Sequence, residues 1–135
     1  MTPETLGHLE KARECLRYAH VNLDAGLTND AGRNAYLAEF HAAQALIFER
    51  TGKVAKTHSG VHTEFNRLGL QEPGLGPELR RILPQTYNLK AVADYETGPD
   101  SLIPFERAAA AVKSAGQFVD CIANVLLRPR SESTS

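Results

Sequence analysis

The stretch from Arg33 to Leu68, RNAYLAEFHAAQALIFERTGKVAKTHSGVHTEFNRL, decides the fold. In its first half, apolar side chains recur every three or four residues and cover a broad face. This spacing predicts a helix that begins at about Asp30, as its N-cap, and ends at Arg50, with Gly52 as the stop. Because its apolar face is so broad, we expect this helix at the centre of a bundle.

The rest of the chain shows the same helical spacing. Alternating β-branched runs are absent, and no Asn-Gly or Asp-Gly hairpin turn appears. Pro84 is expected to kink the fourth helical segment or to split it, leaving Gln85–Tyr95 as the second piece. The predicted helices are Pro3–Gly26 with Thr2 as the cap, Asp30–Arg50, Thr57 or Ser59 to Gly69, Pro77–Tyr95, and Pro104–Leu127. The predicted fold class is all-α, a four- to five-helix up-down bundle.

Size and composition point to one domain. A chain of 135 residues can bury over half of its unfolded surface without a disulfide or a metal. We place the bundle at residues 1–128 and a flexible polar tail at residues 129–135. Cys15 and Cys121 are expected to be free thiols. No leader and no apolar run of roughly 18 residues is seen, so we expect a cytoplasmic protein without a membrane partner.

Four short motifs give the chain a family resemblance. They are AYLA at 35–38, FHAA at 40–43, KTHSG at 56–60 and ADY at 93–95. In this order they resemble the HEPN family (higher eukaryotes and prokaryotes nucleotide-binding). The resemblance implies a helical bundle that forms a homodimer. It also implies an RNase toxin that acts on RNA and is encoded beside a nucleotidyltransferase serving as its antitoxin.

The resemblance further implies a catalytic arginine and histidine. His41 is the histidine of the FHAA motif, and Arg33 precedes it with seven spacers, where the family has four to six. On a helix, Arg33 is rotated about 80° from His41 at an axial distance of roughly 12 Å, whereas Asn34 lies nearly in line with it. Arg33 could lean back or serve the partner subunit, or the pair could be lost. Lys90 stands near where relatives often carry another arginine.

The chemistry expected of the pair needs no metal. A neutral imidazole of His41 could take the 2′-hydroxyl proton of RNA, and Arg33 could offset charge on the phosphorane. Net charge is −1, so anion binding must come from a local patch. Each residue also has a purely structural interpretation, His41 as a packed core histidine and Arg33 as a solvated first-turn side chain.

The predicted RNA contacts are Asn34, Tyr36, Lys56 and His58. Tyr36 could stack on a base or simply pack. Lys56 and His58 stand at a predicted helix N-terminus, where free backbone N–H groups can seat a phosphate. His58 and His62 share a face at i, i+4, as zinc ligands can, but the motif supplies no third ligand. We therefore predict no metal site and no cofactor.

Three functions remain open at this point. The first is a HEPN-type toxin with metal-independent endoribonuclease activity, regulated by a partner nucleotidyltransferase antitoxin. That partner could act by contact or by adenylylating Tyr36 or Tyr95. The alternative is a non-catalytic HEPN module that binds a nucleotide or a partner and has lost the Arg33 and His41 pair. The third is a structural interaction domain whose histidines only pack.

Overall fold

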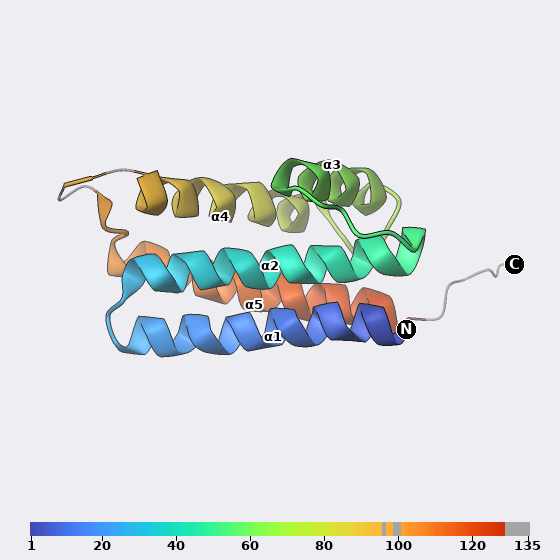
Figure 1. Ribbon diagram of the computed structural model, residues 1–135, viewed down its shortest axis with the longest axis horizontal. Helices are drawn as coiled ribbons and strands as arrows, with labels where there is room; N and C mark the ends of the chain where they lie inside the picture. Colours follow the sequence, from blue (N-terminus) through green and yellow to red (C-terminus); the bar gives the residue numbers. More distant parts are fainter. Residues whose placement is uncertain (96, 99–100, 129–135) are drawn as a thin grey trace, which may run out of the picture.

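A computed structural model describes residues 1–95, 97–98 and 101–128 of the chain. Among these residues it contains five α-helices and no strand, and the long helices run alternately up and down (Figure 1). The helices are α1 (Pro3–Asp24), α2 (Thr28–Thr51), α3 (His58–Gly69), α4 (Pro77–Tyr95) and α5 (Phe105–Leu127). The predicted all-α bundle is confirmed. The tail predicted at 129–135 lies outside the described residues.

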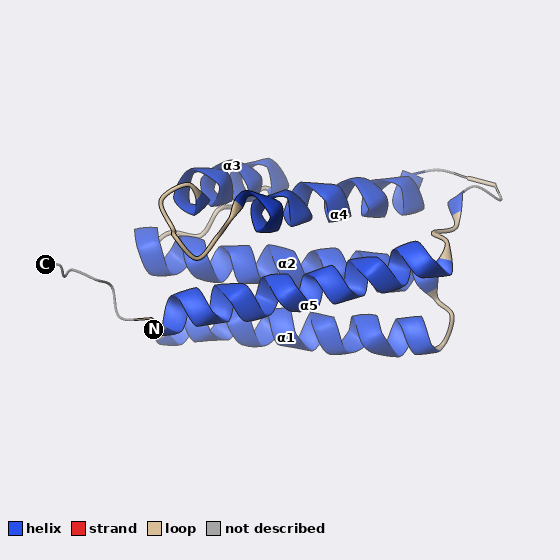
Figure 2. Cartoon of the chain, turned by 180° about the vertical axis from the view of Figure 1, so that it is seen from behind, coloured by secondary structure: helices blue, strands red, loops and turns tan. Residues whose placement is uncertain are grey.

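Helix α2 is the centre of the bundle, as its broad apolar face predicts. It packs against each of the other four helices, with α1 and α5 on one side and α3 and α4 on the other (Figure 2). Its buried face is rich in small side chains, which let neighbouring helices approach closely: Ala31, Ala35, Ala38, Ala42, Ala43 and Ala45. Larger rings fill the remaining space, and Phe65 of α3 stacks on Phe118 of α5 at 5.2 Å between centroids.

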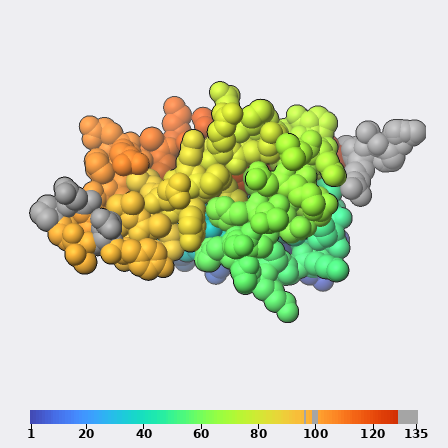
Figure 3. Space-filling model, turned by 90° about the horizontal axis from the view of Figure 1, so that it is seen from above, coloured from blue at the N-terminus to red at the C-terminus, as the bar shows by residue number. Residues whose placement is uncertain are grey.

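Helices α3 and α4 lie side by side and cover one face of α2 (Figure 3). The α4 helix is continuous through Pro84, so of the two alternatives expected there, a kink or a split, the split into two helices is excluded. Pro84 is exposed, and we attribute the tolerance to water, which can reach the carbonyl group that the proline leaves without a donor. The neighbouring Leu83 and Thr86 are buried and hold the helix in place.

The ends of the helices follow local rules with one exception. The Thr2 side chain accepts a hydrogen bond from the Thr5 amide, and Thr57 accepts one from the Gly60 amide at 2.9 Å, so both predicted caps are confirmed. Asp30, however, is not the N-cap of α2, which begins two residues earlier. Its carboxylate lies 2.6 Å from Arg33 one turn later.

Gly52→Ala is expected to lower the free energy of unfolding by about 1 kcal/mol. Gly52 ends α2 with φ of 72°, in the left-handed region, while open space surrounds the position of an added Cβ. Strain in the backbone is therefore the whole effect. Urea denaturation measures it, with Gly7→Ala as the control. Gly7 lies within α1 with open space around it, so alanine there is expected to stabilise the protein.

Helix α5 is long and apolar enough to cross a membrane by length and composition alone. The sequence predicts the helix itself, but it contains no unbroken apolar run long enough to indicate a membrane span. Half of the residues in its most apolar stretch are buried inside the bundle, where the helix packs on α1, α2 and α4. Most of its large apolar side chains are buried, but Phe105 at its first position is 55% exposed. Packing in the core accounts for the apolar composition of this helix.

Candidate functional site

A cluster of aromatic and histidine rings fills the angle between α2, α3 and α4. Its centre is Tyr36 of α2, whose side chain has no exposed surface. The Tyr36 hydroxyl lies 2.9 Å from Nδ1 of His58 and 3.0 Å from Nε2 of His62. The i, i+4 spacing on α3 places these two imidazoles on one face, above the same hydroxyl. We define the ring cluster as Tyr36, Phe40, His58, His62 and Tyr87, with His41 at its edge, where its ring packs on Phe40.

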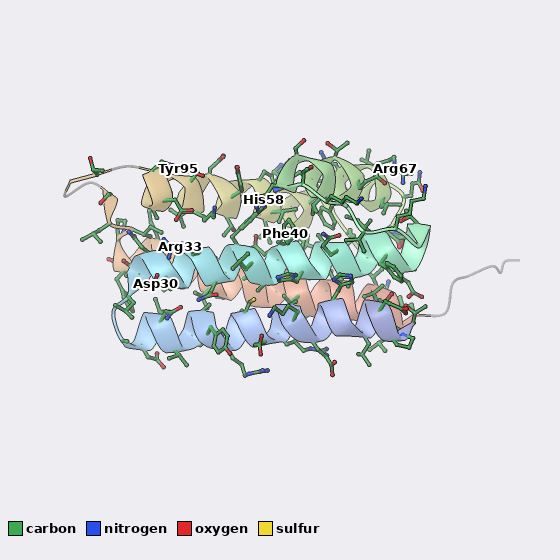
Figure 4. All side chains as sticks on the ribbon, viewed as in Figure 1. Asp30, Arg33, Phe40, His58, Arg67 and Tyr95 are labelled. Carbon is green, nitrogen blue, oxygen red and sulfur yellow. The ribbon has the colours of Figure 1, made fainter. Side chains whose placement is uncertain are left out.

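Two further aromatic rings complete the cluster. Tyr87 of α4 packs on Tyr36 at 5.2 Å and on His62 at 5.3 Å between centroids. Phe40 of α2 is half-buried and packs on His58 at 4.9 Å and on His41 at 5.5 Å. Figure 4 shows Phe40 and His58 together, midway along the bundle. The Phe40 ring therefore connects His41 to the α3 histidines.

His41 occupies the α1 side of α2. Its ring is half-buried, and its pKa is lowered from the ordinary value, mainly by burial and further by the positive charges of Lys11 and His8. An imidazole with a lowered pKa is neutral at physiological pH and can accept a proton. Sequence reasoning missed Lys11 and His8, because their place beside His41 depends on how α1 packs on α2.

Arg33 is not brought to His41 within this chain. Its guanidinium contacts Oδ1 of Asp94 on α4 at 3.0 and 2.8 Å, and Asp30 at 2.6 Å. The pKa of Arg33 is raised, chiefly by the hydrogen bond to Asp94. Arg33 thus faces α4 near the end that carries Tyr95 (Figure 4), whereas His41 responds to charges on α1. The seven spacers between them produce this separation.

Asp94→Asn is expected to lower the free energy of unfolding by about 1 kcal/mol at neutral pH, a modest amount because Arg33 is partly exposed. Asp94 also binds Lys90 at 2.8 Å. Burial raises the pKa of Asp94, but the hydrogen bonds from Lys90 and Arg33 outweigh it, so the net pKa is below 3.8. The stabilisation is therefore fully present above the unfolded-state pKa of 3.8, and it is lost as pH falls through the lower pKa of the folded state. Urea denaturation from pH 7 to pH 2.5 should show wild type and variant converging.

The predicted RNA contacts occupy different environments. The Asn34 amide lies 2.8 Å from the amide of Asn22 on α1, and Lys56 and His58 are exposed. Tyr36 has no exposed surface, which fits the alternative in which its ring packs and does not stack on a base. Burial also closes Tyr36 to a modifying enzyme, whereas Tyr95 is 77% exposed. Tyr36 serves instead to position two histidines.

Ligand clusters for metals are absent from the part of the chain that the structure describes: no three His, Cys, Asp or Glu side chains lie together there. Cys15 and Cys121 are free thiols, as predicted. Two fixed cations close to the rings are Lys11, whose charge reaches His41, and Lys90, whose Nζ lies 5.9 Å from the Tyr87 centroid. The chemistry of the site is therefore that of imidazoles flanked by cations and aromatic rings.

The structure is that of a small all-helical domain: four helices pack around a central α2, with histidine motifs on α2 and at the start of α3. The HEPN domain model matches residues 6–125, and the chain belongs to the HEPN family. A protein of Methanocaldococcus jannaschii with the name "Putative toxin MJ0605" is 33% identical over 118 residues, which cover 87% of this chain and 85% of that protein. The family resemblance seen in the motifs is confirmed.

Proposed function

We propose that this HEPN protein is a cytoplasmic toxin that cleaves RNA internally without a metal ion. The proposal is carried by His41, a half-buried imidazole with a lowered pKa beside the positive charge of Lys11. Such a group is neutral near pH 7 and stands where an attracted phosphate would place a ribose hydroxyl within its reach. The toxin name of the M. jannaschii relative supports the same direction.

In the proposed reaction, His41 accepts the proton of a ribose 2′-hydroxyl. The freed oxygen bonds to the adjacent phosphorus, and the bond from phosphorus to O5′ breaks. The products are a 2′,3′-cyclic phosphate and a 5′-hydroxyl end. Lys11 offsets negative charge on the pentacoordinate phosphorus, a role for which Arg33 is available only if a second subunit brings it to His41.

A homodimer is part of this proposal. Half-buried Leu37 and Phe48 lie within about 40° of His41 around α2, and half-buried Phe40 lies about 100° away, towards His58 of α3. Tyr18 of α1, seven residues after Lys11 and therefore on the same stripe of its helix, is 52% exposed. A second copy seated against this side would cover these apolar groups and bring another set of side chains to the site.

The proposed regulator is a nucleotidyltransferase antitoxin. Tyr95 is the accessible member of the two predicted acceptors for an adenylyl group, since it stands exposed at the end of α4. Its neighbour Asp94 holds Arg33 and Lys90. Modification of Tyr95 would add a negative charge beside these cations and so change how this end of the site meets RNA.

The test is cleavage of single-stranded RNA by purified protein in excess EDTA, with analysis of the product ends. Cyclic phosphate ends and growth arrest on expression are the expected results. RNA binding without cleavage would instead favour a non-catalytic binding module. That second function is favoured by one observation, the neutralisation of Arg33 by two carboxylates away from His41.

A further inference from the structure

We propose that His58 is the general acid of the reaction and that Tyr36 and His62 are positioning residues that resupply its proton. The inference rests on the proposed RNA cleavage and adds the group that protonates the leaving oxygen. It comes from one juxtaposition, the two imidazole nitrogens that meet at a single buried hydroxyl.

A hydroxyl group has one proton to donate, so it cannot donate to two histidines at once. When both imidazoles are neutral, one accepts the Tyr36 proton and the other must donate its own N–H to the Tyr36 oxygen. The outer nitrogen of the first ring then carries a proton, and the outer nitrogen of the second carries a lone pair. Because His58 presents Nδ1 to the hydroxyl and His62 presents Nε2, the shared hydroxyl couples the two histidines into the same tautomer, both Nε2–H or both Nδ1–H.

Burial makes this coupling the exchange route for the Tyr36 proton. Tyr36 has no exposed surface, whereas His58 is exposed and His62 is half-buried. Burial also raises the pKa of Tyr36, so the phenol stays neutral and passes a proton on without storing charge. Tyr87 packs on both imidazoles, at 5.9 Å from His58 and 5.3 Å from His62, and fixes the planes of their rings.

His58 is placed for chemistry because it shares a neighbour with His41. Both imidazoles pack on the half-buried Phe40 ring, and His58 opens α3 at an exposed position. A nucleotide held over Phe40 would have an imidazole on either side. One imidazole can then act as base and the other as acid, the division that a metal-free phosphodiester cleavage needs.

The proton balance of the step is closed. His41 takes the 2′-hydroxyl proton as the O2′–P bond forms, and Nε2 of His58 gives its proton to O5′ as the P–O5′ bond breaks. The Tyr36 proton moves to Nδ1 of His58, the Nε2 proton of His62 moves to the Tyr36 oxygen, and Nδ1 of His62 takes a proton from water. His41 later returns its proton to water.

The first arm of the test is kinetic. His58→Gln is expected to lower kcat for RNA cleavage by roughly 10²–10⁴-fold. Tyr36→Phe and His62→Gln are each expected to lower it roughly tenfold with KM unchanged, and the double variant should be no slower, because both break one relay. His20→Gln, an exposed histidine of α1, is the matched control and should cleave at the wild-type rate.

The second arm does not depend on cleavage. Nitrogen-15 NMR of the imidazoles should show His58 and His62 in the same neutral tautomer in wild type, and Tyr36→Phe should allow each ring to adopt its tautomer independently. Different tautomers in wild type, or tautomers unaffected by Tyr36→Phe, would overturn the relay. A wild-type rate in His58→Gln would overturn its role as the acid and leave the proposed RNase intact. Wild type that cleaves no RNA, but whose matched tautomers are lost in Tyr36→Phe, would overturn the proposed function and the catalytic role but show the shared proton.

Discussion

His41→Gln is expected to lower the rate of metal-free RNA cleavage by roughly 10²–10⁴-fold, the contribution of a general base. Glutamine keeps a polar side chain of similar size at a half-buried position, so the helix is expected to stay intact. What it removes is the lone pair that receives the 2′-hydroxyl proton. The measurement is single-turnover cleavage of a short RNA in EDTA, with circular dichroism to confirm the fold.

The pH dependence of the wild-type rate adds a second check on His41. Its pKa is lowered from the ordinary value of 6.5, first by burial and then by the charges of Lys11 and His8. The acidic limb of the pH–rate profile is therefore expected below pH 6.5, because the base keeps its lone pair until the pH falls through this lowered pKa. Lys11→Gln should move that limb upward. Full activity of His41→Gln would show that His41 is not the general base.

Glu39→Gln is expected to make the free energy of unfolding less dependent on pH. Glu39 is fully buried, accepts one hydrogen bond from Thr86 at 3.0 Å, and has a second oxygen without a partner among the described residues. Burial raises its pKa well above 4.5, and the hydrogen bond from Thr86 offsets only part of this. The carboxyl group therefore stays protonated in the folded protein while it ionises in the unfolded chain.

The sign of the effect follows from this difference. Below pH 4.5 both states hold the proton, and above it only the folded state does, so wild-type stability falls as pH rises toward the folded pKa. Because glutamine cannot ionise, the free energy of unfolding of Glu39→Gln should rise relative to that of wild type by up to about 1.4 kcal/mol per pH unit across this interval. Urea denaturation at pH 4 to 7 measures the slope, with exposed Glu10→Gln as the control. Parallel curves for Glu39→Gln and wild type would contradict the prediction.

Local rules predicted most of the fold. Thr2, Thr57 and Gly52 act within one or two turns, so their effects could be derived without knowing the rest of the chain. Asp30 is not the cap because α2 already begins at Thr28, and its carboxylate binds Arg33 instead. The helix is not split at Pro84, because Pro84 lies on the side of α4 that faces water, and the sequence alone does not show which side that is.

The site was harder to predict because its contacts join distant parts of the chain. The motifs identified His41 and His58, and helical spacing showed that His62 shares a face with His58. Tyr36, however, meets these histidines 22 and 26 residues later, a pairing that only the packing of α3 on α2 creates. Arg33 likewise has its chief partner 61 residues away. Spacing correctly warned that Arg33 and His41 diverge, but it did not give Asp94 as the reason.

The central position of α2 has a consequence for any inhibitor of this protein. Tyr36, Phe40 and His41 all belong to the one helix that contacts every other helix, so its backbone amides should be among the slowest in the molecule to exchange with deuterium. Distorting such a helix would cost a binding partner much of its binding free energy. It would act at lower cost by covering the exposed surfaces of α1 and α3 beside α2, and hydrogen exchange in the complex should then slow at α1 and α3 while α2 stays unchanged.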